Sequence, residues 1–188
     1  MSRVKIDPLQ VESEIAKSGF WVAEQIPDDP QPWLEQLGRV GKWQRLVPCK
    51  HPAGRPRTLS ALHGLGPFPW HTDGAIAVRP PKYLVLFGES DSSSATEVAD
   101  LESRPSLVSS MARTVLRTKT GFGRPRYVSA VERIGSGSLY RWDSDKLEIC
   151  TPGQAPAVEL VQPDADVTWT RDKLLIVDNW RCLHRRQA

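Results

Sequence analysis

The chain has 188 residues, a length typical of one domain, with 39% hydrophobic and 25% charged residues, the ordinary balance of a globular protein. Its formal net charge of +3 is too small to indicate a nucleic-acid partner, and no segment approaches the roughly 20 apolar residues of a membrane-spanning helix. The first residues lack the apolar stretch of a signal peptide, and the three cysteines lie too far apart for a zinc clamp. We therefore expect one cytoplasmic domain over residues 1–188, with no membrane partner.

The N-terminal segment predicts a helix, a strand and a second helix. Asp7 is a typical N-cap, Pro8 suits the first helical position, and Gly19 is a plausible end for the helix that they begin. Residues 20–23 are aromatic and β-branched, which favours a strand. A short helix is expected over residues 32–37, before Gly38.

From about residue 42 the pattern predicts mostly strands, separated by turns rich in Gly, Pro, Asp and Ser. One helix is expected among them, over residues 105–117. The expected strands are residues 43–47, 58–62, 83–87, 127–134, 139–142, 146–150, 158–161, 167–170 and 174–177. Strands and helices do not alternate, which excludes a doubly wound nucleotide fold. A mostly β fold with flanking helices follows, either a sandwich or a jelly roll.

Two segments carry candidate chemistry. Residues 68–74 contain His71 and Asp73, which would project to the same side of a strand. An apolar run over residues 174–177 leads through Asp178-Asn179 to His184. Two histidines and one carboxylate can hold Fe(II) on one face and leave the other positions open.

Each of these residues also has an ordinary explanation. A His-x-Asp pattern arises often by chance and by itself is only a weak indication of a ligand pair. His184 suits an exposed strand end, and Asp178-Asn179 is typical of a hydrogen-bonded turn. From the residues alone, both interpretations stay open.

The combination of four segments is more specific. They are His-Thr-Asp at 71–73, Pro-Pro-x-Tyr at 80–83, the stretch 92–96 that ends in Thr96, and Asp-Asn-x-x-x-Leu-His at 178–184. In this order they resemble the taurine dioxygenase-like (clavaminate synthase-like) family of Fe(II)/2-oxoglutarate-dependent oxygenases. The resemblance covers about two-thirds of the chain and implies a double-stranded β-helix, a cupin-like jelly roll.

The resemblance implies that His71, Asp73 and His184 are the catalytic metal ligands and that Thr96 hydrogen-bonds 2-oxoglutarate. The reaction would use dioxygen to hydroxylate or desaturate an unactivated C–H bond of a small molecule, such as an amino acid or secondary metabolite. In related halogenases a small residue replaces the carboxylate, so Asp73 favours oxygenation over halogenation. Asp178 or Asn179 is expected to orient His184.

One departure concerns the arginine that binds 2-oxoglutarate in relatives, which lies beyond the far histidine. We expect it beyond Ala188, with a C-terminal part of the domain missing. Two alternatives remain. One is a cupin-type metal-binding protein without 2-oxoglutarate chemistry, and the other is a non-catalytic binding domain.

Overall fold

The computed structural model describes residues 6–26, 30–41, 44–46, 58–153 and 155–187, and strands make up most of its regular structure. The helices are α1 (Pro8–Ser18), α2 (Gln31–Leu37), α3 (Leu59–His63), α4 (Pro105–Ala112) and the 3₁₀ helix η1 (Val158–Leu160). The strands are β1 (Phe20–Ala23), β2 (Tyr83–Phe87), β3 (Ser92–Asp100), β4 (Val115–Thr118), β5 (Tyr127–Ser129), β6 (Val131–Ile134), β7 (Gly137–Tyr140), β8 (Leu147–Ile149), β9 (Ala165–Trp169), β10 (Leu174–Asp178) and β11 (Cys182–Arg186). The expectation of a mostly β chain with flanking helices is confirmed.

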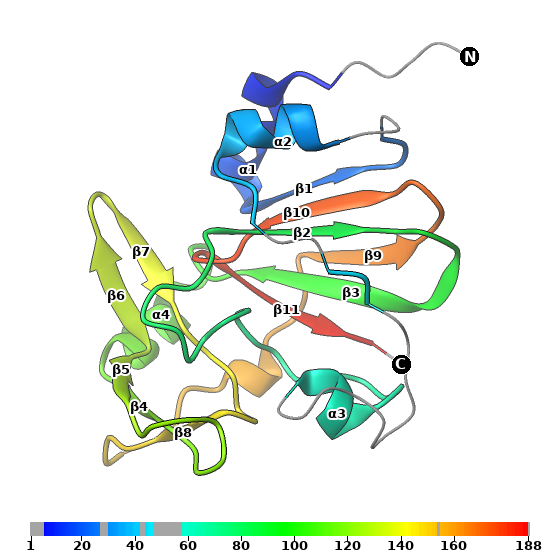
Figure 1. Cartoon of the computed structure of the whole chain (residues 1–188). Coiled ribbons are helices and arrows are strands. Elements are labelled where there is room, and N and C mark those ends of the chain that lie inside the picture. Colours follow the sequence, from blue (N-terminus) through cyan, green and yellow to red (C-terminus); the bar gives the residue numbers. More distant parts are fainter. Residues whose placement is uncertain (1–5, 27–29, 42–43, 47–57, 154, 188) are drawn as a thin grey trace.

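Two antiparallel sheets form the centre of the fold (Figure 1). The first has the strand order β1-β10-β2 and the second the order β11-β3-β9. Their facing sides share one core, in which Leu175 and Val177 of β10 contribute with Val98, Val167 and Cys182 from the second sheet. The two sheets therefore pack face to face, although their strands come from opposite ends of the chain.

Helices α1 and α2 cover the outer side of the first sheet (Figure 1). Val11 and Trp33 pack there against Leu174 and Ile176 of β10. Residues of β10 therefore alternate between the helices and the inter-sheet core, and both faces of this central strand are covered. That double burial explains why β10 reads as an uninterrupted apolar run.

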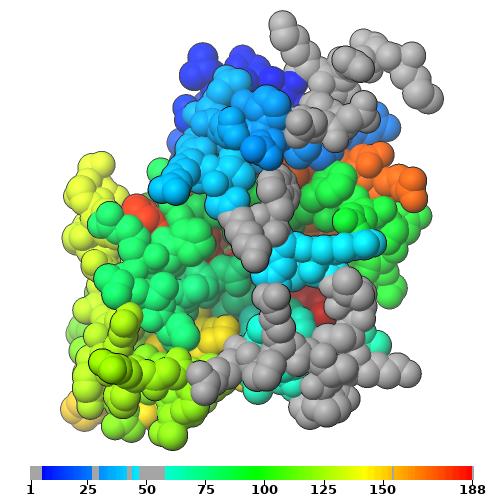
Figure 2. Space-filling view, viewed as in Figure 1, coloured from blue at the N-terminus to red at the C-terminus, as the bar shows by residue number. Residues whose placement is uncertain are grey.

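The outer side of the second sheet has a core of its own. Ala99 of β3 and Leu183 of β11 pack there with Trp70, Met111 of α4 and Leu116 of β4. Two smaller sheets, β5-β4-β8 and β6-β7, lie on this side. Cys182–His184 are buried, and only small parts of the red C-terminal segment are visible on the face shown in Figure 2.

The N-terminal predictions match the structure closely. Asp7 caps α1 by accepting a hydrogen bond from the Leu9 amide at 3.0 Å, and Gly19 ends the helix in the left-handed conformation. Strands β1 and β2 have the expected bounds, and α2 begins one residue earlier than expected. In these segments, capping residues and apolar patterning agree with the tertiary packing.

Several other predictions are wrong. Residues 58–62 were expected as a strand, but Thr58 caps α3 by accepting a hydrogen bond from the Ala61 amide at 3.2 Å. Residues 158–161 contain η1 in place of a strand. Residues 44–46 lie outside any strand, while positions 43 and 47 fall outside the described residues. Runs of four or five residues are too short for periodicity to separate helix from strand.

Two further bounds need correction. The helix expected over residues 105–117 ends at Ala112, and Val115 already belongs to β4. The strand expected over residues 127–134 is broken at Ala130 into β5 and β6, which join different sheets. Among the described residues, no helix has both the length and the apolar character that crossing a membrane requires.

Candidate metal centre

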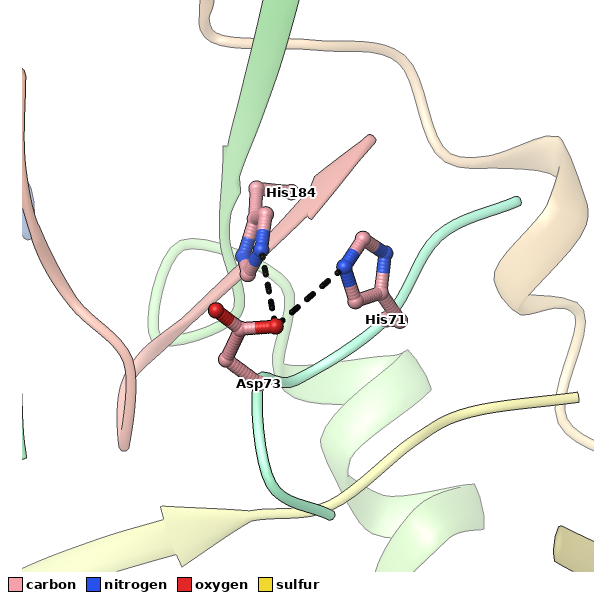
Figure 3. Close-up of side chains that lie close together, drawn as sticks. All are labelled: His71, Asp73 and His184. Atoms are coloured by element: carbon pink, nitrogen blue, oxygen red, sulfur yellow. Dashed lines mark ion pairs between the residues drawn. The ribbon is translucent and has the colours of Figure 1, made fainter. Parts of the chain in front are cut away.

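His71, Asp73 and His184 lie together and point toward one another (Figure 3). One ligand atom from each falls within 4.8 Å of the others. The Oδ1 atom of Asp73 is 3.7 Å from Nε2 of His71 and 4.0 Å from Nε2 of His184. Both imidazoles are buried, whereas the Asp73 side chain is 43% exposed. The group therefore has a closed side, formed by the histidines, and an open side at the carboxylate.

The backbone brings the two histidines together. The His71 amide donates to the His184 carbonyl at 3.0 Å, and the His184 amide donates back at 3.1 Å. Residues that exchange both hydrogen bonds are directly opposite in an antiparallel pair, and the two rings lie 4.2 Å apart between centroids. Because Cys182 and His184 alternate with Leu183, His184 lies on the inter-sheet side of β11.

The expectation that His71 and Asp73 share a strand is wrong. His71 forms only isolated bridges, and Asp73 already belongs to a turn. Gly74 follows with φ of 70°, a left-handed conformation that turns the chain directly after the carboxylate. The two side chains still converge, but a tight turn brings them together.

Asn179 fixes the backbone of Asp73. Its Oδ1 accepts from the Asp73 amide at 2.8 Å, and its Nδ2 donates to the carbonyls of Asp73 at 3.0 Å and Pro81 at 2.9 Å. The expectation that Asp178 or Asn179 orients His184 needs correction, because Asn179 holds the carboxylate-bearing residue and Asp178 caps the local turn at the Trp180 amide. The turn between β10 and β11 places Asn179 beside Asp73, whereas His184 is positioned by the backbone of β11.

A second segment supports the other side of the ligands. The Thr72 amide donates to the Trp142 carbonyl at 2.7 Å, and the Trp142 amide donates to the Thr72 hydroxyl oxygen at 3.2 Å. His71 also forms an isolated bridge with Asp143. The ligand segment therefore lies between β11 and the residues that follow β7, a support that sequence analysis missed.

Burial keeps both histidines neutral. It lowers the pKa of His71, against the opposing attraction of the Asp73 carboxylate, and it lowers the pKa of His184 well below the ordinary value. Nδ1 of His71 lies 3.0 Å from the Pro69 carbonyl oxygen, so Nδ1 carries the proton and Nε2 has a free lone pair. Within the described part of the chain, the buried Nδ1 of His184 has no hydrogen-bond partner. Metal-binding histidines usually have such a partner, and here only His71 has it.

Thr96 lies elsewhere on the second sheet. It is buried in β3, opposite Arg186 of β11 and Val167 of β9. Its hydroxyl oxygen accepts a hydrogen bond from Nε1 of Trp169 at 3.0 Å. A threonine hydroxyl that accepts one hydrogen bond still has its own proton to donate. Because positions alternate along paired strands, Thr96 shares the inter-sheet side with Val98 and His184.

The remaining histidines do not join this group among the described residues. Nε2 of His63 pairs with an Asp145 carboxylate oxygen at 2.6 Å, and its ring packs on Phe68, which in turn contacts His71. His63 therefore lies two contacts away from the group, at the end of α3. His51 falls outside the described residues.

The donor set fits a divalent transition metal. Two neutral imidazoles and one carboxylate are the ligands of mononuclear non-haem iron sites, and the Nε2 lone pair of His71 faces the carboxylate. Ligand atoms within 4.8 Å of one another need only small side-chain movements to reach one ion, because metal–ligand bonds are roughly 2.0–2.2 Å long.

Comparison with known proteins gives structural relatives only. No protein-family profile and no curated sequence matches the chain. Among solved structures, PvcB from Pseudomonas aeruginosa is 16% identical, with a TM-score of 0.67 over 98% of this chain and 75% of that one. A second PvcB structure is described as an Fe, alpha-ketoglutarate dependent oxygenase from an isonitrile synthetic pathway.

Two further structures agree. A taurine dioxygenase from Burkholderia xenovorans is 16% identical, with a TM-score of 0.62 over 98% of this chain and 76% of that one. Asparagine oxygenase in complex with Fe(II), 2S,3S-3-hydroxyasparagine and succinate is 18% identical, with a TM-score of 0.56 over 66% of this chain and 45% of that one. The resemblance inferred from the sequence is thus confirmed at the level of the fold: the chain folds like the taurine dioxygenase-like, Fe(II)/2-oxoglutarate-dependent oxygenases.

Proposed function

We propose that the chain is a non-haem Fe(II)/2-oxoglutarate-dependent dioxygenase that hydroxylates or desaturates an unactivated C–H bond of a small molecule. The observation that carries this proposal is the convergence of His71, Asp73 and His184 within 4.8 Å. Residues from distant parts of the sequence bring together the donor set of this enzyme class. The fold adds support, because its structural relatives include oxygenases of this kind.

Each residue of the proposed centre has a distinct task. His71 and His184 supply neutral nitrogen donors, because burial suppresses their protonation. Asp73 supplies the negative charge and faces the open side, where substrate and co-substrate would enter. Asn179 and the Trp142 segment hold the ligand backbone so that the donors need not reorganise. Iron bound here, with 2-oxoglutarate and dioxygen, would supply the oxidising power for C–H cleavage.

Thr96 is the proposed contact for the remote carboxylate of 2-oxoglutarate. Its hydroxyl accepts from Trp169 and keeps a proton to donate. Its position on the same side of the second sheet as His184 suits a ligand that reaches from the metal into the inter-sheet space.

The substrate class is proposed as amino acids or related secondary metabolites. Asparagine oxygenase, one of the structural relatives, was solved with hydroxyasparagine and succinate, and this supports an amino-acid-like substrate here. We further propose that residues 1–188 belong to one cytoplasmic domain with a double-stranded β-helix, in which the two face-to-face sheets form the jelly roll.

Turnover of 2-oxoglutarate tests this function. Protein loaded with Fe(II) in air should convert 2-oxoglutarate to succinate faster when a panel of amino acids and their derivatives contains the substrate, and the product should be 16 Da heavier or 2 Da lighter. His71→Ala should abolish the conversion. If the protein binds metal but no 2-oxoglutarate, the cupin-type alternative is correct; if it binds neither, it is a non-catalytic domain.

A further inference from the structure

Arg141 is a buried charge without an assigned task. It directly follows β7 and is only 1% exposed, although arginine is rarely buried completely. Such a side chain requires partners for its charge and its N–H donors; among the described residues the two terminal nitrogens of Arg141 have them, whereas its buried Nε has none. The groups that Arg141 contacts therefore indicate what this side chain does in the fold.

The partners lie on the turn that follows Asp73. Nη1 of Arg141 donates to the carbonyls of Ala77 at 2.6 Å and Ala75 at 3.2 Å, and Nη2 donates to the carbonyl of Val78 at 2.7 Å. One planar guanidinium thus gathers three carbonyls of a four-residue stretch. This turn begins at Asp73 itself and continues through Gly74.

The other end of Arg141 is fixed as well. The Arg141 backbone amide donates to the Ala130 carbonyl at 2.8 Å, while Nη2 at the guanidinium end also donates to a Glu132 carboxylate oxygen at 3.0 Å. The next residue, Trp142, exchanges hydrogen bonds with Thr72. The same short segment therefore holds the chain before Asp73 through its backbone and the chain after Asp73 through the Arg141 side chain.

We propose that Arg141 is a positioning residue for the metal centre: it clamps the Ala75–Val78 turn and thereby fixes where Asp73 presents its carboxylate. The inference rests on the proposed metal-binding function and goes beyond it by assigning a determinant outside the ligand set. Asn179 holds the Asp73 backbone by separate hydrogen bonds, so Arg141 and Asn179 are two independent supports of the carboxylate-bearing residue. Arginine suits this task because its planar guanidinium donates to all three carbonyls at once, whereas the single ammonium group of a lysine would reach only some of them.

The test compares cobalt binding by four proteins: wild type, Arg141→Met, Arg141→Lys and Arg117→Met. Arg117 is a matched control, because it forms an exposed cross-strand ion pair with Glu148 on a different sheet. Co(II) is titrated anaerobically into metal-free protein and followed by its visible d–d absorption, after circular dichroism has confirmed folding at the same temperature. The d–d spectrum reports the coordination geometry, which a general loss of stability would leave unchanged in the folded fraction.

We expect Arg141→Met to bind Co(II) roughly 10–100-fold more weakly, with an altered d–d spectrum, as for other residues that support metal ligands. Arg117→Met should bind as wild type does. A folded Arg141→Met protein with wild-type affinity and spectrum would overturn the inference. If Arg141→Met does not fold, Arg141→Lys decides: it keeps the positive charge but can reach only some of the three carbonyls, and an unchanged affinity and spectrum would again overturn the clamp. Wild-type protein that binds no Co(II) would instead refute the proposed metal centre.

Discussion

Replacement of Asn179 by alanine should both destabilise the protein and weaken metal binding. The side chain is fully buried and makes three hydrogen bonds, two to the backbone of Asp73 and one to the Pro81 carbonyl. Each buried hydrogen bond contributes on the order of 1 kcal/mol, and a group left unpaired costs about 1–3 kcal/mol. The loss of all three should therefore lower the free energy of unfolding by about 3–5 kcal/mol.

This loss is measurable as a shift of Tm. In a chain of this size, 1 kcal/mol corresponds to roughly 2–4 °C, so metal-free Asn179→Ala should unfold roughly 6–20 °C below wild type. Metal affinity should fall roughly 10–100-fold. Asp178→Asn is the control, because it retains the acceptor that caps the Trp180 amide. Equal affinity for Co(II) in Asn179→Ala and wild type would refute the idea that this side chain fixes the carboxylate.

Three further perturbations follow from the structure. Gly19→Ala should lower the free energy of unfolding by about 3 kcal/mol, because Gly19 has φ of 82° and a Cβ there would lie 2.3 Å from Sγ of Cys182. A wild-type Tm would contradict the packing at this helix end. The free energy of unfolding of metal-free protein should decrease as the pH falls below about 6.5. The reason is that burial lowers the pKa of His184, so the unfolded chain binds a proton that the folded chain excludes. His184→Gln should flatten this dependence, and an equal slope of stability against pH in the variant and wild type would argue against a buried neutral imidazole. Thr96→Val should weaken binding of 2-oxoglutarate roughly tenfold, the equivalent of about 1.4 kcal/mol for one charge-assisted hydrogen bond. The affinity for Co(II) should not change. Unchanged binding of 2-oxoglutarate would show that Thr96 does not contact it.

The elements that the sequence predicted best are those in which local and tertiary preferences agree. Helix α1 has an N-cap at Asp7 and a left-handed end at Gly19, so its bounds were visible from residue types alone. Strand β10 was recognisable because both of its faces are buried. In residues 58–62 the apolar pattern suggested a strand, but the Thr58 hydroxyl caps a short helix by accepting a hydrogen bond from the Ala61 amide.

The residues of the candidate site could be predicted from the sequence, but the backbone arrangement that brings them together could not. His71, Asp73 and His184 were identified by residue type and by the order of the motifs, and the structure places them together. The reason given for His71 and Asp73, a shared strand, is wrong, because Asp73 lies in a turn. Their role as metal ligands stays a prediction.

Arg141 was not predicted as a support, and Asn179 was expected to orient His184 and not Asp73, because the partners of both side chains are mostly backbone groups. Arg141 and Asn179 act on carbonyls and amides, which leave no pattern of side chains in the sequence. One signal was present for each: Arg141 is a charge within the apolar run of residues 139–142, and Asn179 follows a buried strand. A polar residue that interrupts an apolar run is a general indication of a buried hydrogen-bonding task.

The most direct test of the central claim is an anaerobic titration of metal-free protein with Fe(II) and then 2-oxoglutarate, followed by visible absorption. If His71, Asp73 and His184 form one iron site that admits a chelating co-substrate, a metal-to-ligand charge-transfer band should appear with a stoichiometry of one iron for each chain. The band should be absent in His71→Ala and in His184→Ala, and it should persist in Arg117→Met, which alters an exposed ion pair elsewhere. A band of wild-type intensity in either histidine variant, or wild-type protein that binds Fe(II) without any band on addition of 2-oxoglutarate, would contradict the account.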